Sequence, residues 1–469
     1  MTLLTIGVFV VVGVVLGLAA QSRWRIWALL GVSILSLYWL QPATALRNAD
    51  FWLPTIALLL TALSWAAIRP SMDPAGGREW LAWLVVGAIP LSLAGLRYLP
   101  WGFYLTATRP PAMTQIIPFV LAAALVVVVM AWLNRRSTAW IWVPAVLLVG
   151  LFVVLKSEPL AITASQWARG LTGQNPDLAQ SLDLTWLGFS YFTFRLLHTL
   201  RDRAAGRLPS MTAGEYVTYV LFFPALAAGP IDRAERFIQD LRKQHRLEPA
   251  RFLQAGIRII WGVFKKFVLA DGLAIFALNA ANALEVESSV WLWVLVYGYA
   301  LRLYLDFSGY TDVAIGLGVL AGIELPENFD RPYTRLNLTA FWNSWHITLA
   351  AWFRAYFFNP VTRALRRRRW PVWSIILMGQ VGTMGLIGLW HGIAWNFVLW
   401  GLWHAAGLFI HNRWLDWYRR RPERVKLPGK AASLLSWVLT FHFVALGWVW
   451  FVIPDPQQAL NVLSRLMGG

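Results

Sequence analysis

The chain has 469 residues, of which 58% are hydrophobic and 14% are charged, and its formal net charge is +18. This composition excludes an ordinary soluble domain, and the continuously apolar runs at residues 7–20 and 120–133 indicate membrane helices rather than alternating strands. The basic residues collect in short loops between apolar spans, so the positive charge reports membrane orientation and not nucleic-acid binding. The absence of cysteine excludes a disulfide, a thiolate nucleophile and a cysteine-borne acyl intermediate.

The N-terminal third contains six apolar segments that we expect to be membrane helices. The first segment lacks a basic region before it, so it is expected to be a retained span rather than a cleaved signal peptide. The arginine-rich loops alternate with loops poor in Lys and Arg, which predicts an N-terminus outside the cytoplasm. These spans hold no histidine and almost no acid, so residues 1–183 are expected to form a scaffold that ends in a polar extracytoplasmic excursion. The expected spans are residues 3–20, 26–41, 51–68, 80–96, 115–133 and 139–155.

The middle of the chain is less regular. Apolar pieces bounded by Gly and Pro, such as the one ending at residues 229–233, favour broken or re-entrant helices, which are tolerated only where they line a cavity inside protein. Further on, Lys265 and Lys266 interrupt an apolar helix, and we expect them to snorkel to the membrane interface. Asp306 and Asp312 lie at membrane depth, where they fit either hydrogen bonds between helices or, as the alternative, the lining of a cavity.

The stretch from residue 337 to residue 412 is the most informative part of the sequence. We expect one aromatic helix over residues 338–358, which contains His346. After a basic run, residues 370–412 contain no Asp, Glu, Lys or Arg. This length is about twice the roughly 20 residues that cross a bilayer as a helix, so the segment should cross, turn and return, with His391 near the turn. A last span is expected at residues 432–453.

Histidines are the candidate catalytic groups. Neither a metal-binding histidine pair nor a Gly-x-Ser-x-Gly nucleophile elbow occurs. His404 and His442 lie in apolar segments and are interpreted as core histidines with satisfied nitrogens. His391 differs because Gly388 and Gly392 flank it and allow close backbone approach. An imidazole there is suited to general-base removal of a proton from a hydroxyl that attacks an activated carbonyl such as a thioester, although a structural role remains open. The seven histidines are His198, His245, His346, His391, His404, His411 and His442.

Several separated motifs occur in a fixed order along residues 185–410. They are residues 228–233, 262–271, 328–333, 341–349 and 388–397. Together they resemble the membrane-bound O-acyltransferase family, in its bacterial branch of alginate O-acetylation and teichoic-acid D-alanylation membrane proteins. The resemblance implies an all-α polytopic bundle of about 11 to 13 transmembrane helices, some of them broken or re-entrant, around a central tunnel. Residues 184–412 would be its catalytic core, and residues 413–469 a cytoplasmic basic loop with the last helix.

The resemblance also implies the roles of individual residues. His391 matches the catalytic histidine of the family, and His346 matches an upstream catalytic or orienting group. A usually acidic position is occupied by Ala355, which weakens inferences about the donor or partner. No metal and no permanently bound cofactor is implied. The expected substrate-binding residues are Trp345, Trp390, Trp395, Asn396, Arg354 and Asn343.

The implied reaction moves a short acyl group, with acetyl as first choice. An acyl-CoA or acyl-carrier thioester would enter from the cytoplasm, and a hydroxyl of a cell-surface polysaccharide would accept the group outside a bacterial inner membrane. D-alanyl transfer towards teichoic acid and an acyl relay to an extracytoplasmic partner enzyme are the alternatives. A transporter or flippase is disfavoured because the sequence shows no internal repeat.

Overall fold

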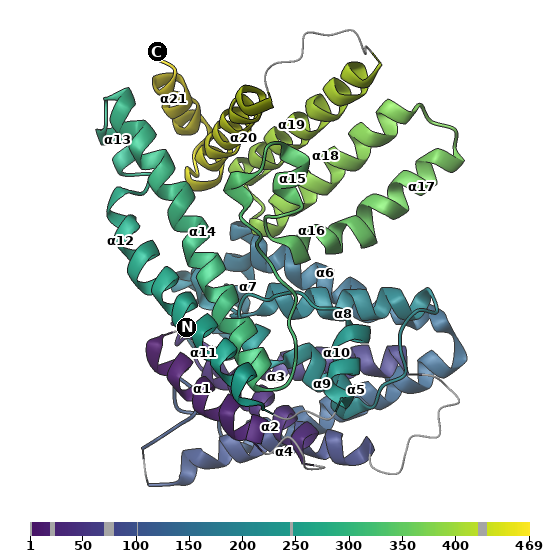
Figure 1. Cartoon of the computed structure of the whole chain (residues 1–469). Helices are drawn as coiled ribbons and strands as arrows, with labels where there is room; N and C mark the ends of the chain where they lie inside the picture. The colour runs from purple at the N-terminus through teal and green to yellow at the C-terminus, as the bar shows by residue number, and fades with distance from the viewer. Residues whose placement is uncertain (1, 19–23, 70–78, 101, 244–246, 421–428) are drawn as a thin grey trace. The chain divides into compact units, whose positions relative to one another are not determined.

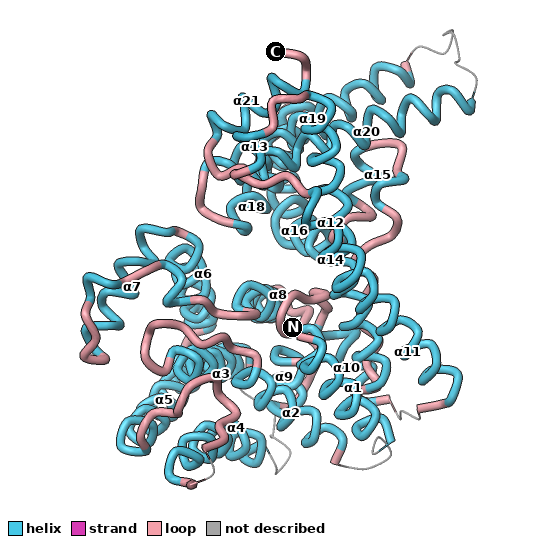
Figure 2. Tube along the Cα trace, turned by 90° about the vertical axis from the view of Figure 1, so that its left-hand side faces the viewer, coloured by secondary structure: helices cyan, strands magenta, loops and turns pink. Residues whose placement is uncertain are grey.

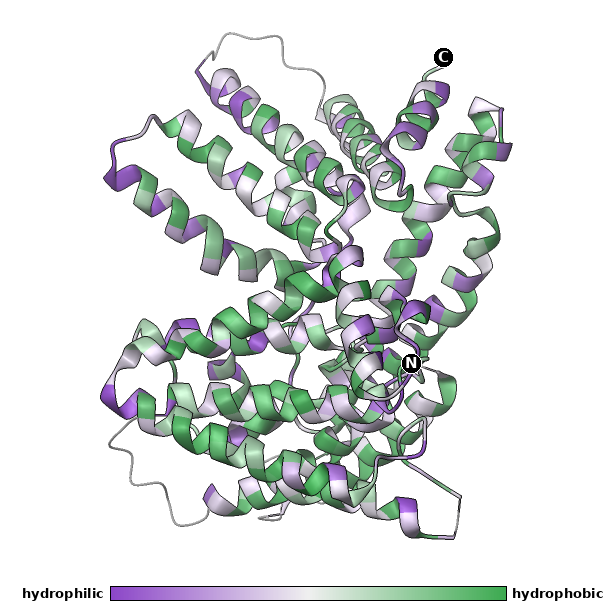
Figure 3. Ribbon diagram, turned by 180° about the vertical axis from the view of Figure 1, so that it is seen from behind, coloured by the Kyte–Doolittle hydropathy of each residue, from purple (hydrophilic) through white to green (hydrophobic). Residues whose placement is uncertain are grey.

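The computed structural model describes residues 2–18, 24–69, 79–100, 102–243, 247–420 and 429–469. Throughout these residues the regular structure is helical, without a strand (Figure 2). Among the residues that the structure describes, seven helices are long and apolar enough to cross a membrane, and α1 (Leu3–Leu18) and α2 (Arg25–Trp39) are shorter apolar helices. Hydrophobic residues run along the helices (Figure 3). The predicted all-α, polytopic membrane protein is therefore confirmed, whereas the number of crossings, the orientation and the tunnel stay predictions.

The chain forms two compact units. The first consists of Met1–Ile259 and Val313–Pro326, and the second of Ile260–Asp312 and Glu327–Gly469. Figure 1 labels their helices. The predicted division at residues 183/184 and 412/413 concerns function and stays a prediction.

The first unit contains the predicted scaffold helices. Its spans are α3 (Ala49–Ile68), α4 (Glu79–Gly95), α5 (Met113–Arg136) and α6 (Trp142–Lys156), close to the predicted segments. The apolar window of α3 is 83% buried, whereas that of α5 is 11% buried. Helix α3 is therefore a core element of the unit, and α5 turns most of its apolar side chains outwards.

The less regular region of the first unit folds as short helices. It comprises α8 (Phe189–Ala204), α9 (Ala213–Leu221) and α10 (Ala234–Arg242), as the Gly and Pro pattern predicts. Arg195 is buried and donates hydrogen bonds to the carbonyls of Val220 and Ala225, both at 2.9 Å. Carbonyls at a helix end lack partners within the helix, so this arginine makes the interruption after α9 tolerable in a dry interior.

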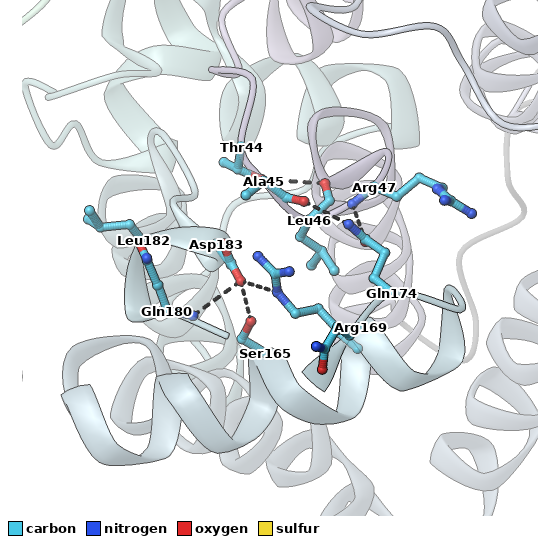
Figure 4. A network of polar contacts seen from close by, with 12 residues as sticks. Thr44, Ala45, Leu46, Arg47, Ser165, Arg169, Gln174, Gln180, Leu182 and Asp183 are labelled. Carbon is cyan, nitrogen blue, oxygen red and sulfur yellow. Dashed lines mark hydrogen bonds and ion pairs between the residues drawn. The ribbon is translucent and has the colours of Figure 1, made fainter. Parts of the chain in front are cut away.

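The predicted polar excursion contains a helix, α7 (Glu158–Leu171), fixed by a buried carboxylate (Figure 4). Asp183 accepts hydrogen bonds from the hydroxyl of Ser165 and the guanidinium of Arg169, both at 2.6 Å, and from the backbone N–H of Gln180 at 3.3 Å. Asp183 is 3% exposed and Arg169 5% exposed. Buried charges require such pairing, so the network fixes the return of the chain after α7.

A second part of the same network ties this excursion to the segment before α3. The amide of Gln174 donates to the carbonyl of Ala45 at 2.8 Å and accepts from the backbone N–H of Arg47 at 2.7 Å (Figure 4). Segments more than 120 residues apart in sequence are thereby held together by an amide that pairs in both directions.

The second unit contains a helical hairpin of α18 (Val372–His391) and α19 (Trp395–Arg419), followed by α20 (Gly429–Val452). A Cβ at Gly388 would lie 2.2 Å from the carbonyl oxygen of Phe397, and one at Gly401 would lie 2.5 Å from that of Met384. The two backbones therefore approach so closely that only glycine fits. The predicted uncharged hairpin is confirmed, and its turn follows His391 directly.

The prediction of one helix over residues 338–358 is wrong. The segment divides into α15 (Leu338–Trp342), α16 (Ile347–Phe353) and a π-helical turn (Arg354–Phe358), after which α17 (Asn359–Arg367) begins. The break between α15 and α16 falls at His346, and hydrogen bonds from a distant loop cause it, as described below.

The lysine prediction is also corrected. Lys265, in the π-helical segment Phe264–Ala270, donates to Asp312 at 2.7 Å, and its neighbour Lys266 pairs with Asp306. The lysines thus bind carboxylates of α14 (Ser289–Leu320) instead of snorkelling separately. The contacts favour the interpretation in which the two carboxylates hold helices together, because ion pairs satisfy charges at membrane depth.

Candidate active site

The backbone at His346 adopts an unusual conformation. Its φ is +43°, in the left-handed region, and its side chain is 3% exposed. Such a conformation costs on the order of 1 kcal/mol and persists only where the surroundings impose it. Here the carbonyl of Asn328 accepts from Ile347 N–H at 2.9 Å, and the N–H of Asp330 donates to the carbonyl of Ser344 at 3.0 Å. The loop around residue 328 therefore replaces the helical hydrogen bonds and holds the break open.

The side chain of Asn328 fixes the imidazole of His346. Its Oδ1 accepts from the backbone N–H of Thr348 at 3.2 Å and from the Thr348 hydroxyl at 2.8 Å. Because a backbone N–H can only donate, the amide oxygen must face this group. The same oxygen lies 3.1 Å from Nδ1 of His346, so Nδ1 carries the proton and Nε2 carries the lone pair. Asn328 is fully buried and sets both the orientation and the tautomer of this histidine.

His391 occupies a different environment, at the last residue of α18. It is half-buried, and its ring centroid lies 4.7 Å from that of Phe451, 5.5 Å from Trp400 and 5.9 Å from Phe397. Aromatic rings from α19 and α20 thus pack around the imidazole. Aromatic packing of this kind places the imidazole without supplying a metal ligand or a charge.

Trp390 connects the two histidines. Its ring centroid lies 5.9 Å from that of His346 and 4.5 Å from that of His391. Successive side chains on a helix diverge by roughly 100°, which explains how Trp390 reaches His346 while His391 faces the aromatic rings of α19 and α20. Two imidazoles from segments 45 residues apart therefore meet at one indole within the second unit.

The other predicted site residues lie at several positions. Trp345 is buried, and its ring centroid lies 5.1 Å from that of Trp448. Asn396 is buried, and its side-chain amide donates a hydrogen bond to the backbone carbonyl of Phe451 at 3.5 Å. Phe451 is the residue whose ring packs on His391. Trp395 is 73% exposed, so its side chain points away from the packed interior. Their roles in substrate binding stay predictions.

Arg354 and Asn343 form a separate polar pair. The guanidinium donates to the Asn343 side-chain oxygen at 2.5 Å, and both residues are accessible. Their contact bridges the break at His346 from the π-helical turn to the end of α15. This position indicates that the pair stabilises the break in the helix. Substrate binding by either residue remains a prediction.

The remaining histidines differ from one another. His442 is satisfied as predicted: Nε2 pairs with the Tyr297 hydroxyl and Nδ1 with the carbonyl of Val438, both at 2.7 Å. His404 is completely buried beside Trp400, yet neither of its ring nitrogens has a hydrogen-bond partner among the described residues, which corrects the expectation of a satisfied core histidine. His245 lies outside the described residues.

Sequence reasoning missed Asn328, Trp400 and Phe451 as parts of the site. Asn328 stands in a polar motif whose connection with His346 is visible only in three dimensions. Phe451 comes from the last long helix, where nothing in the sequence distinguishes it from other apolar residues.

The chain is similar to a known protein family and to several known proteins. The membrane-bound O-acyltransferase family matches residues 138–447, which is more than half of the chain. A peptidoglycan O-acetyltransferase of Helicobacter pylori is 35% identical over 256 residues, covering 54% of this chain and 46% of that protein. The chain spans about half the length of this relative. The family match over residues 138–447 includes His346, His391 and the loop at Asn328.

Two further relatives have different names. A teichoic acid D-alanyltransferase of Bacillus subtilis is 31% identical over 277 residues, covering 57% of this chain and 69% of that protein. A probable alginate O-acetylase of Azotobacter vinelandii is 33% identical over 282 residues, covering 60% of this chain and 53% of that protein. The family match over most of the chain, together with the two histidines at one indole, identifies this protein as a member of the membrane-bound O-acyltransferase family.

Proposed function

We propose that this protein transfers a short acyl group, acetyl as first choice, from a thioester to a hydroxyl of a cell-surface polymer. The observation that carries the proposal is the meeting of His346 and His391 at Trp390, in a chain of this family. The names of the relatives support the chemical class, since they acylate peptidoglycan, teichoic acid or alginate.

The proposed reaction forms one bond and breaks another. The acceptor oxygen attacks the thioester carbonyl while the imidazole of His391 takes the hydroxyl proton as general base. The C–O bond forms, the C–S bond breaks, and the proton passes to the departing sulfur to give the free thiol. His346, held with its lone pair on Nε2, accepts a hydrogen bond from a neighbouring hydroxyl of the acceptor and so orients the acceptor for attack. The Trp390 indole separates the imidazoles and keeps their spacing fixed.

The donor is proposed to be acyl-CoA or an acyl-carrier thioester that reaches the site from the cytoplasm of a bacterial inner membrane. The basic residues of α17, among them Arg363 and Arg366, offer charge for the donor phosphates. We propose that the acyl group passes directly from the donor to the polymer hydroxyl. A relay through an extracytoplasmic enzyme is the alternative route to the same ester.

D-alanyl transfer is the second candidate, because a D-alanyltransferase matches over 57% of this chain. The two reactions differ in the mass added to the polymer. Mass spectrometry of surface polymers from cells with and without the gene identifies the group, and loss of D-alanine esters alone would replace acetyl as the assignment.

The test compares histidine variants at equal membrane expression. His391→Ala is expected to reduce ester formation by about 100-fold or more, the usual contribution of a general base. His346→Gly removes the second imidazole and suits the left-handed backbone at that position. His411→Ala, in α19 and 20 residues after His391, is the matched histidine control. Wild-type ester levels in His391→Ala would refute the proposed role.

A further inference from the structure

The first unit contains an apolar cleft between three of its membrane helices. Helix α5 packs against both α3 and α4, as Figure 2 also shows. The space between them has a volume of about 410 Å³ and opens to one side. It lies entirely in the scaffold helices, so it is independent of the histidine site.

The lining residues follow one face of each helix. On α3 they run from Thr55 to Arg69 with helical spacing, and α4 contributes Trp83, Gly87 and Pro90. The fourteen steps from residue 55 to residue 69, at 1.5 Å each, give a length of roughly 21 Å, which exceeds half of the roughly 30 Å hydrocarbon core. The cleft is therefore deep enough for a chain that extends through one leaflet.

Small side chains create the space. Alanines of α3 and α5 form much of the lining, and a Cβ built at Gly87 meets no atom within 4 Å. Neighbouring helices normally fill such positions, because empty volume in a packed interior loses contacts. A ligand that fills it must be apolar, since the walls offer almost no hydrogen-bonding group: the Thr55 hydroxyl already donates to the carbonyl of Phe51 at 2.7 Å.

One end of the cleft is charged. Arg69 follows the last residue of α3, and its guanidinium lies 3.5 Å from the carboxylate of Glu79, the first residue of α4. The Arg69 side chain remains 36% exposed and the Glu79 side chain 16% exposed. A phosphate alone would meet attraction from one group and repulsion from the other, whereas a phosphate next to an ammonium complements both.

We propose that this cleft binds a membrane phospholipid with a zwitterionic phosphoethanolamine-type headgroup. One acyl chain occupies the space along Ala62 and Gly87, the phosphate pairs with Arg69, and the headgroup ammonium pairs with Glu79. The lipid thereby completes the packing of α3, α4 and α5.

The first experiment measures lipid retained by the purified protein, by native mass spectrometry and by extraction. Gly87→Leu places a side chain in the cleft at a position where an added Cβ meets no atom within 4 Å, and it is expected to lower retained phosphoethanolamine lipid about tenfold, because it displaces several methylenes of the acyl chain. Gly150→Leu is the matched control: it lies in α6, also meets no atom within 4 Å, and should retain wild-type lipid. Equal retention in Gly87→Leu and the control would overturn the proposal.

A second experiment tests the headgroup. Glu79→Gln removes the partner of the ammonium and should shift retention from phosphoethanolamine lipids towards anionic phosphoglycerol lipids, by several-fold in the ratio of the two. An unchanged ratio would refute the headgroup assignment. If Gly87→Leu fails to fold, Ala124→Leu fills the same cleft from α5 and replaces it. Acyltransferase activity is not the readout, so failure of the proposed reaction leaves this result interpretable.

Discussion

The two histidines of the site are held in position by opposite means. His391 ends a helix that packs so tightly on its neighbour that Gly388 and Gly401 leave no room for a Cβ. His346 lies in an unwound turn where Asn328 supplies both backbone and side-chain hydrogen bonds. Packing therefore determines where His391 is, whereas hydrogen bonds determine which way His346 faces and which nitrogen carries its proton. Variants that disturb one kind of support should leave the other intact.

The largest expected effect concerns the packed side of this comparison. In Gly388→Ala the new Cβ would lie 2.2 Å from the Phe397 carbonyl oxygen, so α18 and α19 must separate. Overpacking of this kind costs about 3 kcal/mol, the upper end of its usual range. Thermal unfolding of the protein in detergent measures the loss, and esterification should fall with it because His391 ends the same helix.

Gly385→Ala is the matched control for that prediction. It lies one turn earlier in α18, and its Cβ meets nothing within 4 Å. Alanine is the better helix former, so this variant should be unchanged or more stable by about 0.5 kcal/mol. If both glycine variants behaved alike, close helix approach would not be what holds His391.

The next effect concerns the hydrogen-bonded side. Asn328→Ala removes the oxygen that accepts from Thr348 and His346, and it leaves buried donors without a partner. We expect a loss of about 2 kcal/mol in stability, from the cost of buried unsatisfied donors. Activity should fall further than stability explains, because the tautomer of His346 is no longer fixed.

Thr348→Val sharpens this result. It removes the hydroxyl donor but keeps the backbone N–H that orients the Asn328 amide. Catalytic turnover at saturating substrate should therefore stay within a few-fold of wild type. Equal losses of turnover in Asn328→Ala and Thr348→Val would mean that Asn328 acts only through stability.

A smaller effect isolates the backbone strain. His346→Ala and His346→Gly both lack the imidazole, but only glycine adopts a φ of +43° without a Cβ penalty. The glycine variant should be more stable than the alanine variant by about 1 kcal/mol. Chemical denaturation of the two proteins measures the difference, and a more stable alanine variant would show that the turn relaxes.

The sequence predicts the packed side of the site better than the polar side. An uncharged run over residues 370–412 and the glycines around His391 are local signals of a hairpin, and the structure contains it at those residues. The break at His346 has no local signal, since the surrounding aromatic residues suit a helix. Its cause lies in Asn328 and Asp330, which are 16 to 18 residues away along the chain. Hydrophobic periodicity reports which side chains are buried, but not which distant carbonyl replaces a helical hydrogen bond.

The last and smallest effect extends the comparison to pH. Burial raises the pKa of the Asp183 carboxyl, but the hydrogen bonds from Arg169, Ser165 and Gln180 outweigh it and hold the pKa below the ordinary value of 3.8. A depressed carboxyl pKa stabilises the fold fully above pH 3.8, and this contribution is lost as the pH falls below 3.8. Hydrogen exchange should therefore show the amides of α7 losing protection below pH 3.8. Residues 370–412 contain no Asp or Glu, so this part of the α18–α19 hairpin has no carboxyl to protonate and the protection of its amides should not change over the same range. Parallel loss of protection in both segments would indicate global acid unfolding, whereas selective loss at α7 would show that the hydrogen-bonded segment depends on charge and the close-packed hairpin does not.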